Sequence, residues 1–183
     1  ERESLELSAD VWALLEKAPE KYSLVISDGA GNPVELSGKK LLSMKEKGNL
    51  KIAEKLYYLN KALHGVDIYY TAQLPEIFLF VHPIGSVIGR ALFSDYFICY
   101  QGVTVGCLND GIFPEFKGPA ILYSNSSVLG KCIVGKNVCI AANTSVANQD
   151  ISDDTIVIAR DGKNTLSGNN KTVFQRPPFV YGS

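Results

Sequence analysis

The chain has 183 residues, of which 46% are hydrophobic and 20% are charged, and its net charge is -1 from 18 basic and 19 acidic residues. This length suits one domain, or one domain with a small cap. The charges form no basic block, so we expect no nucleic-acid partner. No apolar stretch approaches the roughly 20 residues that span a bilayer, and the chain starts with no signal-peptide pattern, so we expect a cytoplasmic protein without membrane contact.

Residues 1–65 predict an α-rich cap. A helix is expected to begin near Ser8 and to end near Pro19. Two short apolar runs, Tyr22–Ile26 and Val34–Leu36, flank a Gly-rich turn and predict a small hairpin. From about Gly38 to Leu63 apolar residues recur at helical spacing, with an expected break at Gly48 and Asn49.

After residue 80 the apolar residues follow a period of six, which neither a helix nor a plain strand explains. Two sets of five positions lie in phase, and we expect their side chains to point inward: Val81, Val87, Phe93, Cys99 and Val105, then Leu122, Val128, Val134, Ile140 and Val146. Each six-residue unit is one short strand and a turn, and three units close a triangular coil whose inward side chains stack on the next coil. The pattern predicts a mainly β fold, a left-handed parallel β-helix of hexapeptide repeats.

Three regions follow from this pattern: a cap over residues 1–65, a β-helix over residues 66–160 and a tail over residues 161–183. Residues 107–119 break the repeat and are rich in turn formers, so they predict a surface loop inserted into the coil. The tail continues no repeat, and Thr172–Phe174 is its only expected strand. The four cysteines, Cys99, Cys107, Cys132 and Cys139, form no CxxC pair, and we interpret them as free thiols, mostly buried.

The order of four motifs resembles the hexapeptide-repeat acyltransferases, and among them the serine acetyltransferases and related sugar O-acetyltransferases. The motifs cover about residues 66–160, and they are Val66-Asp67-Ile68, then His82 fifteen residues after Asp67, then Gly85-Ser86-Val87-Ile88-Gly89, then Gln101-Gly102-Val103-Thr104-Val105-Gly106 before the loop. The resemblance implies direct acetyl transfer from acetyl-CoA to a hydroxyl or amine, without a metal. It also implies a homotrimer with sites between subunits.

The same resemblance gives His82 the role of general base and Asp67 the role of holding its imidazole. The chemistry agrees, because an alcohol needs a positioned base to attack a thioester and a carboxylate behind the ring stabilises the imidazolium. Because His82 follows an inward position, we expect its side chain to point outward. The other histidine, His64, closes a predicted helix, where a cation is favoured and no catalytic role is needed.

Two positions depart from the serine acetyltransferase pattern. Those enzymes have an acidic residue directly before the histidine, where this chain has Val81, and their loop ends in Arg-His-Pro, where this chain has Ile112-Phe113-Pro114. With Val81 and Phe113 as acceptor-binding residues, the pocket would leave the charges of a free amino acid without partners. We therefore expect a sugar or glycan precursor as the small-molecule acceptor, with serine as the alternative.

In the related enzymes the CoA arm lies along the outside of the coils. Its contacts here are predicted at small residues and at two cations: Ser124, Ala141, Ala142, Lys136 and Arg160. A non-catalytic β-helix scaffold stays open as an alternative of another class, because the repeat needs no histidine to fold. A γ-type carbonic anhydrase on the same helix is rejected, because it needs three metal-binding histidines and the chain has 2.

Overall fold

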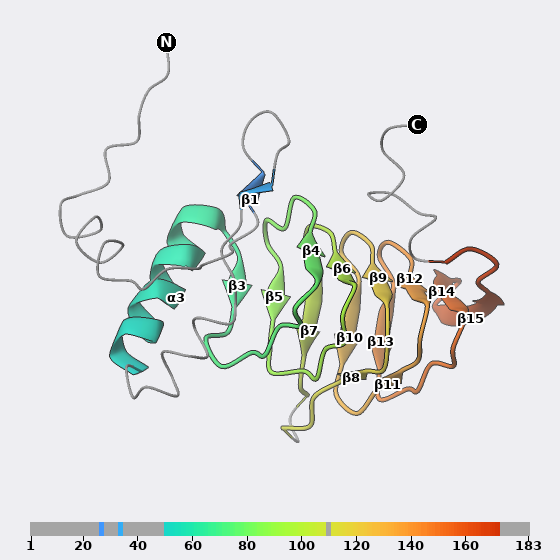
Figure 1. Ribbon diagram of the computed structural model, residues 1–183. Coiled ribbons are helices and arrows are strands. Elements are labelled where there is room, and N and C mark those ends of the chain that lie inside the picture. Colours follow the sequence, from blue (N-terminus) through green and yellow to red (C-terminus); the bar gives the residue numbers. More distant parts are fainter. Residues whose placement is uncertain (1–25, 28–32, 35–49, 109–110, 173–183) are drawn as a thin grey trace, which may run out of the picture.

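The computed structural model describes residues 26–27, 33–34, 50–108 and 111–172 (Figure 1). In the first part, β1 (Ile26–Ser27) and β2 (Pro33–Val34) pair antiparallel where the hairpin is predicted. The helix α3 (Leu50–His64) begins just after the predicted break and ends next to Gly65. The helix predicted near residues 8–19 and the first part of the stretch from Gly38 lie outside the described residues.

From Asp67 onward the chain winds into stacked coils with three sheets, as Figure 1 shows. The first sheet has five parallel strands: β3 (Asp67–Ile68), β5 (Val87–Ile88), β7 (Thr104–Gly106), β10 (Ser127–Leu129) and β13 (Ser145–Ala147). The second sheet consists of β4 (Phe78–Phe80), β6 (Phe97–Cys99), β9 (Ala120–Leu122), β12 (Val138–Ile140), β14 (Thr155–Arg160) and β15 (Lys163–Gly168). The third sheet pairs β8 (Glu115–Phe116) with β11 (Ile133–Val134) and is extended by single bridges.

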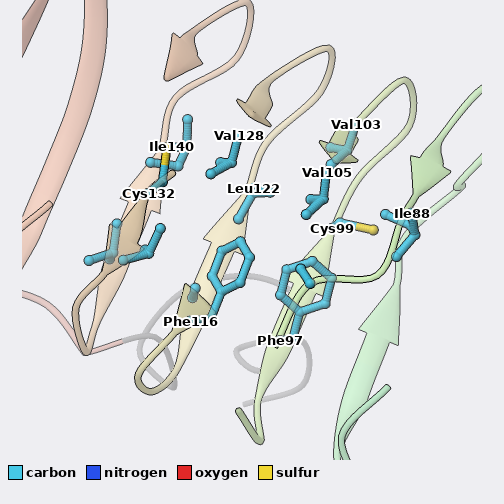
Figure 2. Close-up of a cluster of buried hydrophobic side chains, with 14 of the residues drawn as sticks. Ile88, Phe97, Cys99, Val103, Val105, Phe116, Leu122, Val128, Cys132 and Ile140 are labelled. Carbon is cyan, nitrogen blue, oxygen red and sulfur yellow. The ribbon is translucent and has the colours of Figure 1, made fainter. Parts of the chain in front are cut away.

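Strands one coil apart are in register, so their inward side chains form continuous columns (Figure 2). In the first sheet one column contains Ile88, Val105, Val128 and Val146, all 0% exposed. In the second sheet the equivalent column is Phe80, Cys99, Leu122, Ile140 and Val157. Burial of these apolar side chains along the coil axis is the main term that stabilises the fold.

The six-residue phase is wrong at two of its ten positions. Val87 is 42% exposed on the outer surface, and the inward residue of its strand is Ile88, which is 0% exposed. Val81 is half-buried and packs on the outer side of the second sheet, against a cluster formed by Ile98, Ile121 and Cys139. The phase fails there because the inward residues of this coil are unevenly spaced: Phe80 and Ile88 are eight residues apart, and Ile88 and Phe93 are five apart, instead of six.

The inserted loop is shorter than residues 107–119, because the chain rejoins the coil at β8. Phe116 is 2% exposed and pairs with Val134, so it belongs to the core. The tail contains a strand that the pattern missed, since β15 pairs antiparallel with β14 at the end of the stack. The predicted strand Thr172–Phe174 extends beyond the described residues.

The interpretation of the cysteines as free thiols is confirmed: Cys99, Cys132 and Cys139 are buried, and Cys107 is exposed. Burial raises the pKa of the Cys99 thiol far above its usual range, so this thiol stays protonated. None of the helices in the described ranges has the length and apolar content needed to cross a membrane.

Candidate functional site

The corner between the second and first sheets is built on a column of residues with left-handed backbone. The first residue of this column donates its backbone N–H to the Lys61 carbonyl at the end of α3, and each later one donates to the corner of the coil before it, as Gly85 does to the Gly65 carbonyl at 2.8 Å. Only glycine, and less readily asparagine, adopts this conformation at little cost, which explains the residues in the column. They are Gly65, Gly85, Gly102, Asn125 and Asn143, with φ from 57° to 76°.

His82 lies in the one corner of this column that is lengthened. Val81 and Gly85 are separated by three residues, His82, Pro83 and Ile84, whereas the equivalent positions of the next coils are separated only by Gln101, Ser124 and Ala142. The extra residues bulge outward, so Ile84 is 71% exposed and His82 is exposed as well. His82 also has a left-handed backbone, with φ of 48°, which is uncommon outside Gly, Asn and Asp.

Asp67 stands on β3 with both carboxylate oxygens bonded to the helix that precedes it. The Tyr57 hydroxyl donates to Oδ1 at 2.7 Å, and the Lys61 ammonium lies 2.6 Å from Oδ2. Tyr57 and Lys61 are four residues apart, so they lie on the same face of α3. The helix therefore positions the carboxylate through two of its side chains.

These contacts decide the charge state of the carboxylate. Burial alone would raise the pKa of Asp67, but the hydrogen bonds from Lys61 and Tyr57 outweigh it, so this pKa lies below its ordinary value. The same hydrogen bond raises the pKa of Lys61. The pair is thus an ammonium and a carboxylate throughout the neutral range.

In the described part of the chain, no hydrogen bond joins Asp67 to His82. Asp67 pairs in register with Val87, and His82 is in the turn that leads into that strand, so both residues belong to the same corner region. Tyr57 and Lys61 use two of the roughly four lone-pair positions of the carboxylate, which leaves room for a further donor. The pairing of Asp67 with the imidazole stays a prediction.

Four of the five predicted CoA-binding residues lie along one edge of the coil stack. Ser124 and Ala142 occupy the corner position of the two later coils, and Ala141 directly precedes Ala142. The backbone N–H of Ala159 donates to Thr144 Oγ1 at 3.1 Å, which brings the end of β14, and Arg160 with it, to the same edge. Lys136 is at a different corner, between β11 and β12, and its backbone N–H donates to Asp153.

The two predicted acceptor-binding residues are not together within one chain. Val81 packs on the outer side of the second sheet, whereas Phe113 lies in the inserted loop, and its Cε1 would be 3.3 Å from a Cβ added at Gly89. Phe113 instead contacts Arg90, whose guanidinium carbon is 5.4 Å from the ring centroid.

Sequence analysis missed Tyr57, Lys61 and Arg90 as site residues. The spacing of Tyr57 and Lys61 on one helix face, shortly before the Val-Asp-Ile motif, was the available signal for two of them. No sequence signal marks Arg90, because its contact with Phe113 depends on the path of the loop. At the end of α3, burial lowers the pKa of His64, so the neutral imidazole is favoured there rather than the expected cation.

No cluster of three or more potential metal-ligating side chains occurs within residues 50–108 and 111–172.

Comparison with known proteins places the chain near one enzyme family. A serine acetyltransferase of Synechococcus elongatus is 33% identical over 112 residues, which are 59% of this chain and 46% of that protein. A crystal structure of the serine acetyltransferase of Brucella abortus with coenzyme A has a TM-score of 0.67 at 21% identity, over 74% of this chain and 54% of that one. The serine acetyltransferase isoform 3 of Entamoeba histolytica with cysteine has a TM-score of 0.62 at 25% identity, over 73% and 49%.

The predicted resemblance to the serine acetyltransferases is therefore confirmed, and so is the fold class, a mainly β left-handed parallel β-helix. No protein-family model matches the chain. The chain spans about half the length of the curated relatives that it matches.

Proposed function

We propose that this chain is an acetyl-CoA-dependent O-acetyltransferase and that its acceptor is the hydroxyl of serine or of a close analogue. The relatives by sequence are serine acetyltransferases, which favours the serine alternative over the sugar acceptor that the apolar Val81 and Phe113 suggested. The observation that supports the proposal most is the lengthened corner that presents His82 outside the coil.

The proposed reaction is a direct transfer with His82 as general base. The imidazole takes the proton of the acceptor hydroxyl as its oxygen attacks the thioester carbonyl carbon. A C–O bond forms, the C–S bond breaks, and the proton returns from the imidazolium to the leaving CoA sulfur. Asp67 is proposed to orient the ring and to stabilise the imidazolium, since its carboxylate is held ionised by Lys61 and Tyr57.

The donor is proposed to lie along the edge that continues from His82. Ser124, Ala141 and Ala142 are small and leave the backbone of this edge open to the pantetheine arm. Arg160 is exposed at the end of the same edge and is suited to a CoA phosphate. The Brucella abortus neighbour was solved with coenzyme A, which supports this class of donor. Lys136 stands at another corner, so its predicted CoA contact requires a neighbouring chain.

A homotrimer is proposed as the active state. The side chains of Ile84 and Val87 are 71% and 42% exposed beside His82, and exposed apolar side chains around a site are typical of a surface that a second subunit covers. Light scattering coupled to gel filtration tests this proposal. A monomer would contradict it.

An acceptor screen tests the proposed function. Wild-type protein is incubated with acetyl-CoA and L-serine, glucosamine or a nucleotide-sugar, and the acetylated product is quantified by liquid chromatography. Released CoA is not detected with a thiol reagent, because that reagent would also react with the exposed thiol of Cys107. The proposal expects O-acetylserine from L-serine. Acetylation of only the sugars would restore the glycan acceptor, and no transfer to any acceptor would favour the non-catalytic scaffold.

A further inference from the structure

The side chain of Arg90 lies between two aromatic rings that come from different coils. Its guanidinium carbon is 5.5 Å from the ring centroid of Tyr69 and 5.4 Å from that of Phe113. Tyr69 follows β3, Arg90 follows β5, and Phe113 belongs to the loop between β7 and β8. The coil thus provides Arg90 and the Tyr69 ring, and the inserted loop provides the second ring, that of Phe113.

Both rings also pack against other residues, which hold them in place. The Phe113 ring rests on Gly89, where an added Cβ would lie 3.3 Å from Cε1 and 3.0 Å from the Val105 carbonyl oxygen, so only glycine leaves space for the ring. The Tyr69 ring contacts Tyr57 edge-on at 6.0 Å between centroids and Tyr70 at 4.7 Å. Arg90 therefore loses less side-chain freedom on binding a ligand than a free surface arginine would.

No carboxylate neutralises this guanidinium in the described part of the chain. The acidic residues of the neighbouring strands already have ammonium partners, because Asp67 pairs with Lys61 and Glu115 pairs with Lys117. A guanidinium has five N–H donors, and none of the hydrogen bonds or ion pairs found in the described part of the chain uses those of Arg90. Arg90 is exposed, so these donors are available to a ligand.

We propose that Arg90 binds an oxyanion of a substrate, through paired hydrogen bonds from the edge of its guanidinium. A carboxylate or a phosphate matches the planar fork of an arginine. Both occur in the proposed reaction, as the carboxylate of serine and as the phosphates of CoA, and in this respect the inference rests on the proposed function. Phe113 then acts through Arg90, as a positioning residue that keeps the fork in place.

The test measures dissociation constants, so it does not depend on turnover. L-serine, L-serinamide and CoA are titrated by calorimetry against wild type, Arg90→Gln and Arg90→Lys, with Lys55→Gln as the charge-matched control, since Lys55 is exposed on α3. A charge-assisted hydrogen bond supports a change of about tenfold or more. We expect Arg90→Gln to weaken the binding of one ligand by that factor, Arg90→Lys to recover only part of the loss, and Lys55→Gln to bind like wild type.

The arms separate the two sources of the oxyanion. If Arg90→Gln weakens the binding of L-serine until it binds no more tightly than L-serinamide, the ligand of Arg90 is the acceptor carboxylate. If only the binding of CoA is weakened, the ligand is a phosphate. Unchanged dissociation constants for all three ligands, or an equal loss in Lys55→Gln, would overturn the inference. If L-serine is never acetylated but binding still depends on Arg90, the proposed function fails and the oxyanion site stands.

Phe113→Ala provides a second variant that keeps the charge. Removal of one ring is expected to weaken the same ligand several-fold, while Leu108→Ala, in the same loop and exposed, leaves binding unchanged. Equal binding by Phe113→Ala and wild type would show that the rings do not position Arg90.

Discussion

The hydroxyl of Tyr57 donates a 2.7 Å hydrogen bond to Oδ1 of Asp67, and this bond joins α3 to the first strand of the coil. Asp67 is thereby fixed from the helix side, and its strand pairs in register with β5, which follows the turn that contains His82. The helix is thus more than an end cap, since it sets the position and the charge of a proposed catalytic group.

Replacement of Tyr57 by Phe removes this bond and keeps the ring. We expect the free energy of unfolding to fall by roughly 1 kcal/mol, because a half-buried carboxylate loses a donor, and the pKa of Asp67 to rise toward its ordinary value. Urea unfolding and carboxyl-carbon NMR measure the two effects. Tyr58→Phe is the control, since Tyr58 is 66% exposed, and an equal loss in both variants would contradict the account.

His64 is expected to make stability depend on pH. Burial lowers its pKa in the folded chain, so between that value and about 6.5 the unfolded state binds more protons. The stabilising contribution is complete above about pH 6.5 and is lost as the pH falls through the folded-state pKa. Urea midpoints at pH 7.5 and pH 5 should differ less in His64→Gln than in wild type, and identical pH slopes would refute this.

Position 102 of the corner column is expected to require glycine, because it has no room for a Cβ atom. Its φ is 66°, and a Cβ added there would lie 2.2 Å from Asn125 Oδ1. Gly102→Ala should lower the free energy of unfolding by about 1–3 kcal/mol through backbone strain. Gly106→Ala is the matched control, because the closest atom to its added Cβ is 4.0 Å away. Similar urea midpoints for the two variants would mean that position 102 does not require glycine.

The corrected phase of the repeat can be tested with neighbouring residues. Ile88 is 0% exposed and Val87 is 42% exposed, so Ile88→Ala should cost about 2–5 kcal/mol of unfolding free energy. Val87→Ala should cost clearly less, because the proposed subunit interface covers Val87 only in part whereas Ile88 lies in the core. Chemical denaturation of the two variants measures this difference. The reverse order would restore Val87 as the inward residue.

Sequence periodicity predicted the coil because every six-residue unit must place an apolar side chain in the core at the same position. It failed at Val81 and Val87 because the corner after Val81 has extra residues and the corner after Ile88 is one residue short, so a strict period of six loses its phase. The extra residues include His82, so this irregularity of the repeat and the proposed catalytic residue coincide. Functional sites are where a local rule is expected to fail.

The contacts between distant segments were beyond sequence reasoning. Arg90 meets Tyr69 and Phe113 only because coil stacking and the inserted loop bring three separate segments together. Strand β15 was missed for a related reason, since it pairs antiparallel with β14 and follows no six-residue period.

Acetyl transfer from acetyl-CoA to L-serine, compared between wild type and His82→Ala, tests the central claim most directly. With folding verified by circular dichroism and urea midpoint, we expect wild type to form O-acetylserine and His82→Ala to be slower by about 10²–10⁴-fold, the usual contribution of a general base. A folded His82→Ala protein that forms O-acetylserine at the wild-type rate would contradict the account.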